Sequence, residues 1–219
     1  MNKLEIDHAQ RNKCVKNDYL EKIAMYIVIE GCIGAGKTTV ARQLAFERQS
    51  VLILEKFTQN PFLKEFYSEP SKYALETELA FVLIHYHELF HDLPEVKDSD
   101  CISDFHVAKD LIFARMNLIK ADDLQVFMEL YKVLTRRLIT PDVVVFLRCS
   151  DELVMERVNK RNRDIELKAP QQYFIKLNGL YEEYYDELKL PKICVDMDDC
   201  DFVKDPSRIK WISERIDNL

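Results

Sequence analysis

Short apolar runs alternate along this chain with longer stretches that have a helical pattern. Five such runs occur, at residues 24–30, 50–55, 100–104, 141–150 and 190–197. Continuous apolar runs predict strands that are buried on both faces. Their alternation with helices predicts a parallel sheet that is covered by helices on both sides. The pattern therefore predicts an α/β fold with a five-stranded parallel sheet.

The stretch 74–93 has the clearest helical periodicity. Apolar side chains recur there at spacings of three and four residues, at Leu75, Leu79, Val82, Tyr86, Leu89 and Leu93. At about 100° per residue they form one stripe, and Glu78 and His85 lie at its edge rather than on the opposite, solvated face. We therefore expect both polar side chains at the boundary of the core.

The charge balance of the chain restricts the classes of partner. The 219 residues carry a net charge of −7, and the isoelectric point is about 5.4. This balance argues against a protein whose main task is to bind nucleic acid or an anionic membrane. No apolar run approaches the ~20 residues of a membrane span, and the N-terminus lacks the apolar core of a secretory signal. Residues 1–22 are polar and predict an N-terminal extension before one domain at 23–219.

Cysteine usage indicates a cytoplasmic protein. The six cysteines form no CxxC pair and stand at Cys14, Cys32, Cys101, Cys149, Cys194 and Cys200. We expect reduced, mostly buried thiols, with a disulfide or zinc framework as the alternative. His87 and His91 are interpreted as surface histidines rather than a metal pair. Four tyrosines at helical spacing are interpreted as packing residues, at Tyr173, Tyr181, Tyr184 and Tyr185.

Three of the chain's four glycines lie within six residues, at Gly31, Gly34 and Gly36. Residues 31–38, GCIGAGKT, match the pattern G-x-x-x-x-G-K-[ST] between a predicted strand and a helical stretch. Glycines let backbone N–H groups wrap closely around phosphate oxygens, and a helix N-terminus adds partial positive charge. The loop therefore predicts a binding site for a nucleoside triphosphate.

Each residue type in this loop has an expected role. Lys37 should contact the β- and γ-phosphates of ATP, and Thr38 should bind Mg²⁺. The residues expected to bind ATP are Gly31, Cys32, Ile33, Gly34, Ala35, Gly36, Lys37, Thr38, Thr39, Arg161 and Arg163.

Two carboxylates follow predicted strands. Glu55 ends the second strand, where ligands of parallel sheets gather, and it can take a proton from a hydroxyl acceptor. An ordinary strand-end carboxylate is the alternative. Asp104 follows the third strand and can hold Mg²⁺ directly or through water. The alternative for Asp104, a helix N-cap, is compatible with that role.

The segment 155–166, MERVNKRNRDIE, is rich in arginine. Arg157, Arg161 and Arg163 follow a helix-like run after the fourth strand. Phosphoryl transfer needs positive charge around the moving group, and arginine matches phosphate oxygens. A solvated basic helix end is the alternative. Since the three arginines repel one another, we expect segment 157–166 to be mobile until it closes over bound nucleotide.

Together these segments resemble the deoxynucleoside kinase family, most closely its bacterial branch with purine-type or broad specificity. The resemblance runs from about residue 25 to residue 203. It rests on the segments IEGCIGAGKTT, LEKFTQNPFLKEFY, ELAFVLIHYHEL, SDFHVAKDLIFA, PDVVVFL and ERVNKRNRDIE. The P-loop alone is common to many NTPases, but the combination is far more specific. It implies a P-loop NTPase fold with an arginine-rich lid, and a homodimer.

The resemblance also implies roles for individual residues. Glu55 matches the base that takes the proton of the 5′-hydroxyl, and Tyr67 and Glu166 match the pair that holds the sugar 3′-hydroxyl. Glu78 matches the residue that recognises the nucleobase, and Asp104 lies near the acidic metal-site residue. The expected catalytic residues are Lys37, Glu55, Arg157 and Arg161. The expected substrate residues are Glu55, Tyr67, Glu78, His85, Asp104 and Glu166, and the expected Mg²⁺ ligands are Thr38 and Asp104.

Four positions depart from the family pattern. His85 and Phe105 stand where the family usually has arginine. Asn162 replaces a glycine of the lid, and Cys32 replaces an asparagine of the P-loop. A neutral imidazole offers one donor and one acceptor where a guanidinium offers five donors. The first two departures touch the acceptor site, so they bear on base recognition and on the level of activity.

The favoured function is ATP-dependent phosphorylation of the 5′-hydroxyl of a small-molecule deoxynucleoside, with a purine preferred. A nucleotide kinase, such as one for thymidylate, is the first alternative. Its acceptor would favour arginine near Glu55 and Glu78, where this chain has acids and a histidine. A catalytically silent relative is the second alternative. His85 and Phe105 support it, whereas the P-loop residues and Glu55 oppose it.

Overall fold

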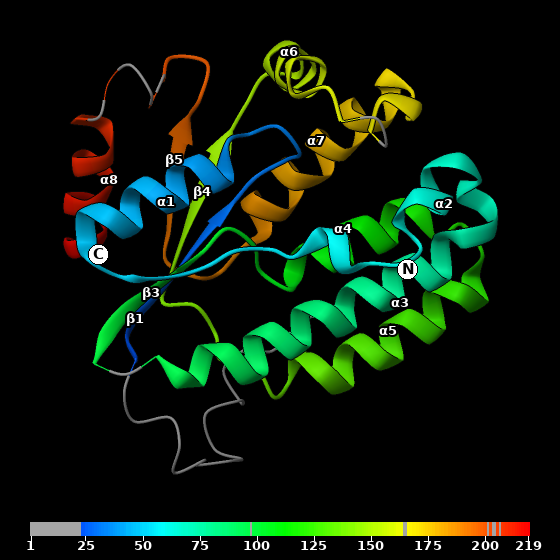
Figure 1. Cartoon of the computed structure of the whole chain (residues 1–219), viewed down its shortest axis with the longest axis horizontal. Helices are drawn as coiled ribbons and strands as arrows, with labels where there is room; N and C mark the ends of the chain where they lie inside the picture. Colours follow the sequence, from blue (N-terminus) through cyan, green and yellow to red (C-terminus); the bar gives the residue numbers. More distant parts are fainter. Residues whose placement is uncertain (1–22, 97, 164–165, 201, 203–204, 206) are drawn as a thin grey trace.

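The sheet contains five parallel strands. The computed structural model describes residues 23–96, 98–163, 166–200, 202, 205 and 207–219. The predicted N-terminal extension, 1–22, lies outside these residues. The strands are β1 (Ile23–Glu30), β2 (Val51–Ile53), β3 (Ser99–Ser103), β4 (Val143–Arg148) and β5 (Lys192–Asp196). They pair in the order β2-β3-β1-β4-β5, and every pairing is parallel. The predicted α/β fold is therefore confirmed (Figure 1).

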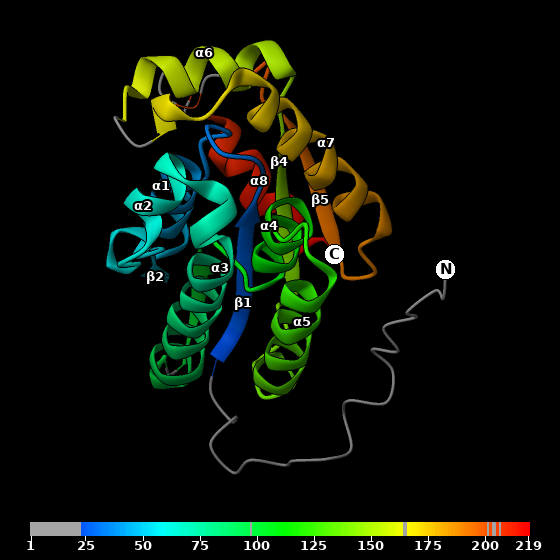
Figure 2. The ribbon, with the colours of Figure 1, turned by 90° about the vertical axis from the view of Figure 1, so that its right-hand side faces the viewer.

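Eight α-helices surround the described part of the sheet. They are α1 (Lys37–Arg48), α2 (Leu63–Ser68), α3 (Pro70–His87), α4 (Ala108–Asn117), α5 (Ala121–Thr135), α6 (Asp151–Arg161), α7 (Gln171–Glu187) and α8 (Ser207–Asp217). Short 3₁₀ helices occur at η2 (Phe57–Gln59), η4 (Leu93–Glu95) and η5 (Glu166–Lys168), and a π-helical turn at η3 (Glu88–Asp92). Figure 2 shows α3 and α5 side by side, with α6 at the opposite end of the molecule. No helix in the described part is long and apolar enough to cross a membrane.

The two faces of the sheet bury different clusters, because side chains alternate along each strand. Ile27 and Ile29 of β1 pack in a cluster that contains residues of α1 and α8. Tyr26 and Val28 pack in a second cluster, with residues of α3 and α5. The prediction of strands buried on both faces holds for the inner strands but is wrong for β2 and β5. They are the sheet edges, where Val51 is 41% exposed and Asp196 is exposed.

The helix predicted at 74–93 begins at Pro70, and its α-helical part ends at His87. The predicted apolar stripe coincides only in part with the buried face, because Val82, Leu89 and Leu93 are buried and its other members are not. Glu78 and His85 are completely buried, whereas Leu75 and Leu79 are only partly buried. The polar pair therefore lies within the buried face, and its partners must come from neighbouring elements. The exposed His87 and His91 fit their interpretation as surface residues.

The carboxyl ends of the strands bring the sequence motifs together. Gly31 follows β1 directly, Asp104 follows β3, and Glu55 lies two residues beyond β2. The five cysteines in the described part of the chain carry free thiols, and only Cys194 of the five is not fully buried.

Candidate active site

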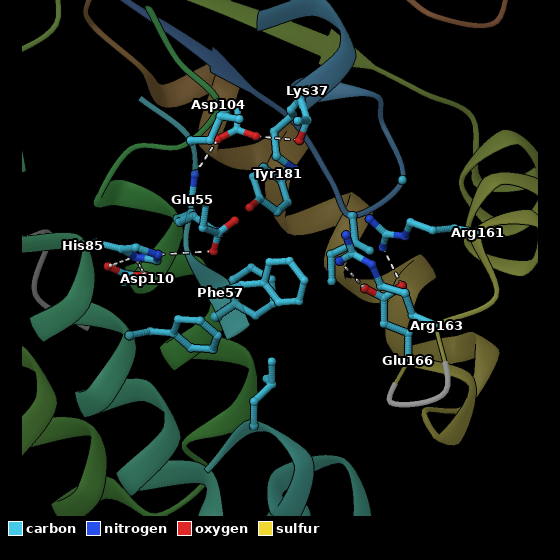
Figure 3. A pocket seen from close by; sticks show the side chains of 18 of the residues that line it. Lys37, Glu55, Phe57, His85, Asp104, Asp110, Arg161, Arg163, Glu166 and Tyr181 are labelled. Atoms are coloured by element: carbon cyan, nitrogen blue, oxygen red, sulfur yellow. Dashed lines mark hydrogen bonds and ion pairs between the residues drawn. The ribbon is translucent and has the colours of Figure 1, made fainter. Parts of the chain in front are cut away.

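A cavity of about 540 Å³ opens at this edge of the sheet. Its lining combines the P-loop, the segment after β2, the inner faces of α3 and α4, the lid and α7 (Figure 3). The volume suits a small molecule, since such sites usually measure about 300–1,000 Å³. Figure 3 shows Glu55, His85 and Asp110 on one side, and Arg161, Arg163 and Glu166 on the other.

Steric constraints explain why glycine occurs at two positions of the P-loop, Gly31 and Gly36. Gly31 has φ +148°, and a Cβ there would lie 2.7 Å from the carbonyl oxygen of Leu147. Gly36 caps α1 with φ +99°, a conformation that other residues rarely adopt. Ile33, Gly34 and Thr39, which are among the residues expected to bind ATP, line the cavity. The side chains of Cys32 and Ala35 are buried in the core, so these two residues can offer a ligand only their backbone.

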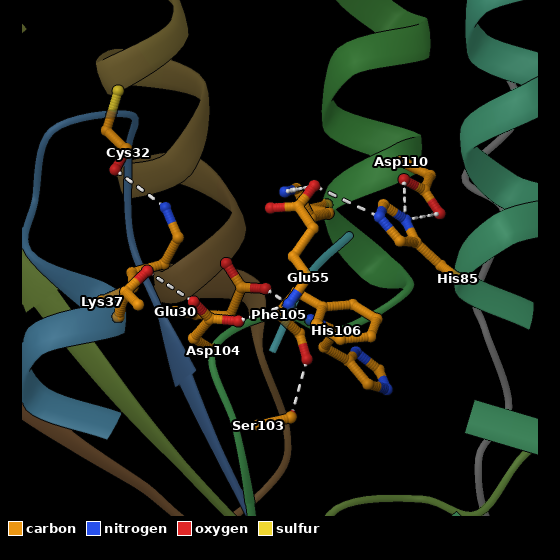
Figure 4. Close-up of polar contacts among 12 residues, drawn as sticks. Glu30, Cys32, Lys37, Glu55, His85, Ser103, Asp104, Phe105, His106 and Asp110 are labelled. Carbon is orange, nitrogen blue, oxygen red and sulfur yellow. Dashed lines mark hydrogen bonds and ion pairs between the residues drawn. The ribbon is translucent and has the colours of Figure 1, made fainter. Parts of the chain in front are cut away.

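Lys37 lies across the P-loop. Its Nζ donates to the carbonyl oxygen of Cys32 at 3.0 Å (Figure 4). It also donates to the carbonyl oxygen of Gly31 at 2.7 Å. Burial and the nearby charge of Lys109 lower the pKa of Lys37, against the opposing effect of Glu30 and Glu55. A buried ammonium beside the anion-binding loop is strongly favoured to pair with phosphate.

Asp104 connects the P-loop to the segment after β2. Its Oδ2 accepts a hydrogen bond from Thr38 Oγ1 at 2.5 Å, and its Oδ1 accepts one from the backbone N–H of Glu55 at 2.8 Å. Val107 occupies the cap position of α4, so the alternative of Asp104 as the N-cap is wrong. The hydroxyl and carboxylate oxygens are hard ligands that suit Mg²⁺, which commonly takes few protein ligands besides phosphates. The described residues contain no cluster of three or more His, Cys, Asp and Glu that could hold a metal by itself.

Glu55 is held between two buried cationic groups. Its Oε1 accepts from Lys109 Nζ at 2.6 Å and from His85 Nε2 at 3.2 Å. Burial would raise the pKa of Glu55, but the charge of Lys109 and the hydrogen bond from His85 outweigh burial and hold it well below its usual range. The carboxylate is therefore ionised at neutral pH and faces the cavity as a hydrogen-bond acceptor.

His85 is protonated in this setting. Its Nδ1 lies 2.7 Å from Asp110 Oδ1. Burial alone would lower the pKa of His85, but Asp110 and Glu55 outweigh it and raise the pKa to about 9. Phe105 packs on His85 with ring centroids 4.8 Å apart. The two residues that stand where the family usually has arginine are therefore in contact with each other. Both ring nitrogens of His85, which was expected among the substrate residues, are therefore engaged by carboxylates.

The sequence reasoning missed the part of this site that lies on α4. Lys109, Phe113 and Asn117 all line the cavity, and Asp110 holds His85. Their spacing of four residues was the available signal, since it places Lys109, Phe113 and Asn117 on one helical face directly after Asp104. Glu30 was also missed. It lies beneath the P-loop and accepts from the backbone N–H groups of Gly31 and His106.

Lys109→Met should make catalysis more sensitive to acid. Without Lys109, only His85 opposes the effect of burial, so the pKa of Glu55 is higher than in wild type. Glu55 then takes up a proton at a pH where it is still ionised in wild type. We expect kcat/KM to fall with decreasing pH by about tenfold per unit below the new pKa, where wild type is still active. Lys109→Arg restores the charge and should restore the profile. If kcat/KM falls at the same acidic pH in wild type and in Lys109→Met, Lys109 does not set the ionisation of Glu55.

The cavity also contains the residues expected to hold the sugar and to recognise the base. Glu78 is 2% exposed, and its Oε1 accepts from Asn117 Nδ2 at 2.8 Å. Tyr67 and Tyr173 lie edge to face, with ring centroids 6.5 Å apart. Tyr67 and Glu166, the expected sugar pair, both line the cavity. Tyr173 and Tyr181 pack against the core, as interpreted, and they also line the cavity.

The lid arginines are already paired. Arg161 Nη2 lies 2.5 Å from Glu166 Oε2, and Arg163 Nη1 lies 3.3 Å from Glu166 Oε1. Arg157 Nη1 donates to the carbonyl oxygen of Ala35 in the P-loop at 2.8 Å. The expectation that repulsion among the arginines keeps this segment mobile left out Glu166, which neutralises part of their charge. Residues 164 and 165 lie outside the described residues.

The backbone conformation of Asn162 shows why asparagine can replace the glycine that the family usually has in the lid. It ends α6 in the left-handed conformation, with φ +50° and ψ +47°. Glycine is the commonest residue at this position of a helix end, and asparagine is a frequent substitute. The lid therefore keeps the backbone conformation that a glycine would provide.

Nucleotide should slow hydrogen exchange in the lid. Phosphates would add contacts to Arg157, Arg161 and Arg163 that Glu166 alone does not supply. We expect slower exchange of backbone amides in residues 157–163 with ATP, and little change in α8, which serves as the internal control. Equal exchange with and without ATP would contradict a lid that closes on phosphate.

The comparison with known families decides what this site belongs to. The sequence model of deoxynucleoside kinases matches residues 27–219 of the chain. The chain belongs to the deoxynucleoside kinase family. Membership makes it a kinase, a phosphotransferase whose acceptor is a deoxynucleoside.

Individual relatives agree with the family. The chain is 31% identical over 204 residues to deoxyguanosine kinase of Bacillus subtilis (strain 168), covering 90% of this chain and 98% of the relative. It is 27% identical over 167 residues to deoxyadenosine kinase of Dictyostelium discoideum, covering 74% of this chain and 67% of the relative. The structure of deoxyadenosine kinase from M. mycoides with products dCMP and dCDP has the same fold. It superposes with a TM-score of 0.79 at 24% identity, covering 89% of this chain and 100% of that one.

Proposed function

We propose that this deoxynucleoside kinase transfers the γ-phosphoryl group of ATP to the 5′-hydroxyl of a purine deoxynucleoside. The observation that carries the proposal is the ionised, cavity-facing carboxylate of Glu55 beside a P-loop whose Lys37 also lines the cavity. The purine preference is supported by the relatives named above as deoxyguanosine and deoxyadenosine kinases.

In this proposal Glu55 accepts a hydrogen bond from the 5′-hydroxyl and orients its oxygen toward the γ-phosphorus. The bond from the 5′-oxygen to phosphorus forms while the bond from phosphorus to the bridging oxygen of ADP breaks. The hydroxyl proton passes to Glu55 and then to solvent. Because Lys109 and His85 hold the pKa of Glu55 low, Glu55 is a weak base, and positioning of the hydroxyl is the larger part of its contribution.

Cationic side chains of this chain would neutralise the negative charges of the phosphates. Lys37 would bind the β- and γ-phosphates, and Arg157, Arg161 and Arg163 would bind them from the lid. Thr38 and Asp104 would hold Mg²⁺, which would neutralise phosphate charge when it is bound. Tyr67 and Glu166 would hold the 3′-hydroxyl, and Glu78 would recognise the base.

An acceptor panel tests the proposal. Purified protein with Mg·ATP is given each of the four deoxynucleosides and, separately, each of their 5′-monophosphates. We expect monophosphates to form from deoxynucleosides, with the purines preferred, and no diphosphates to form from monophosphates. Turnover of monophosphates only would favour the nucleotide kinase, and no turnover at all would favour the silent relative.

Two finer properties belong to the same proposal. A homodimer is supported by exposed apolar side chains on the neighbouring helices α3 and α5, namely Leu83, Val126 and Val133. Light scattering of the purified protein measures the oligomeric state. A cytoplasmic location is supported by the free thiols of the described cysteines.

A further inference from the structure

Glu78 lines the cavity, and one of its carboxyl oxygens has no hydrogen-bond partner among the described residues. Oε1 is held by the amide of Asn117, whereas Oε2 is buried and makes no hydrogen bond with any described residue. Buried polar atoms are nearly always paired, and leaving one unpaired is costly. Since Glu78 lines the cavity, the missing partner of Oε2 is best supplied by a ligand.

The protonation form of Glu78 decides which ligand edge fits. An ionised carboxylate only accepts hydrogen bonds, whereas a neutral carboxyl group donates one and accepts others. Guanine presents two adjacent donors on its Watson–Crick edge, the N1–H and the N2 amino group. Adenine presents a donor, the N6 amino group, beside an acceptor, N1. The carboxylate therefore fits guanine, and the neutral acid fits adenine.

We propose that Glu78 recognises the Watson–Crick edge of a purine in both protonation forms, so that preference for deoxyguanosine over deoxyadenosine rises with pH. This inference rests on the function proposed above and extends it to the identity of the base. In the ionised form, Oε1 and Oε2 accept from N1–H and the N2 amino group of guanine. In the neutral form, Oε2–H donates to N1 of adenine, and Oε1 accepts from the N6 amino group.

Asn117 fixes which oxygen carries the proton. Its amide does not titrate, and its N–H donates to Oε1 in either form, which leaves Oε2 as the site of protonation. A carbonyl-type oxygen has two lone pairs, so Oε1 can accept from Asn117 and from the base together.

The surroundings of Glu78 keep both forms accessible near neutral pH. Burial and the nearby charge of Asp110 raise the pKa of Glu78, whereas the hydrogen bond from Asn117 and the charges of Lys109 and His85 lower it. The net effect raises the pKa of Glu78 to about 8. Tyr67 on α2 and Tyr173 on α7 also face Glu78. Burial raises the pKa of both phenols, so they stay neutral in this range. His85 lies on the same helix, and Lys109 and Asp110 lie on α4.

The test is the ratio of kcat/KM for deoxyguanosine to kcat/KM for deoxyadenosine, measured from about pH 6 to about pH 8.5. Each kcat/KM is proportional to the fraction of free enzyme in the matching form of Glu78. The ratio should therefore rise by about tenfold per pH unit, whatever the pKa of Glu78. Effects of pH on ATP, the lid and Glu55 act on both substrates and cancel in the ratio.

Two variants of α3 complete the test. Glu78→Gln fixes one donor and one acceptor, so the ratio should fall in favour of deoxyadenosine and should no longer change with pH. Glu76→Gln removes an exposed carboxylate two residues away and should keep the wild-type slope. A constant ratio in wild type, or a slope that persists in Glu78→Gln, would overturn this inference alone. No turnover of either nucleoside would overturn it together with the proposed function.

Discussion

Lys37→Ala should abolish measurable turnover, a loss of about 10³-fold or more. The substitution removes the ammonium beside the P-loop, and no other described lysine donates to the carbonyl oxygens of Gly31 or Cys32. The fold should persist, because the side chain makes no contact that the sheet requires. Turnover is measured with saturating deoxynucleoside and Mg·ATP, beside the thermal unfolding of the same preparation.

Lys210→Ala is the matched control for Lys37→Ala. Lys210 is exposed on α8, and its substitution also removes one ammonium. We expect this variant to keep the wild-type rate. Near-normal turnover in a folded Lys37→Ala protein would mean that the P-loop does not bind the transferred phosphate.

Glu55→Gln should lower kcat by about 10²–10⁴-fold. Glutamine keeps the shape and the hydrogen-bonding reach of Glu55 but cannot take the proton. The loss should lie toward the lower end, because Lys109 and His85 make Glu55 a weak base. Affinity for ATP should change little, since Glu55 does not belong to the P-loop. The measurement is kcat together with ATP binding, and Glu47→Gln, at an exposed carboxylate on α1, is the control.

The structure adds an effect on stability that the sequence did not predict. Glu55 is the shared anion of Lys109 and His85, and removing one member of a buried charge cluster leaves the others uncompensated. The pKa of Glu55 is lowered in the fold, so its ionised form stabilises the protein above the unfolded pKa, and this contribution disappears as pH falls. Glu55→Gln should therefore also lower the unfolding temperature at neutral pH.

Glu55→Asp separates stability from catalysis. It keeps the negative charge between Lys109 and His85 but draws the carboxylate back by one methylene from the hydroxyl. We expect stability near that of wild type and a reduced kcat. A Glu55→Gln protein that binds ATP and keeps full kcat would contradict the role of Glu55 and favour a phosphate acceptor, which needs no such base.

The architecture was predictable because its signals are local. Apolar runs indicated the strands, and the glycine spacing indicated the phosphate loop, whose backbone only glycine adopts easily at Gly31 and Gly36. The edge strands β2 and β5 were predicted to be buried on both faces, but they are partly exposed. Periodicity does not show which strand lies at the edge of a sheet. Val51 illustrates this error.

The charge network of the site was only partly predictable. Glu55 and His85 were recognised from their positions, but their connection through Lys109 and Asp110 depends on how α3 and α4 face each other. No spacing along the chain encodes that contact. The pairing of Glu166 with Arg161 and Arg163 is local, since all three lie within six residues, and it was missed because Glu166 was assigned only to the sugar.

The identity of the product tests the proposed phosphoryl transfer directly. Deoxyguanosine and Mg·ATP are incubated with the protein, and the nucleoside product is examined by mass spectrometry and phosphorus NMR. We expect wild type to form a monophosphate with the phosphoryl group on the 5′-oxygen, and Lys37→Ala to form none. A product phosphorylated at the 3′-oxygen, or no nucleoside product from wild type with any of the four deoxynucleosides, would contradict it.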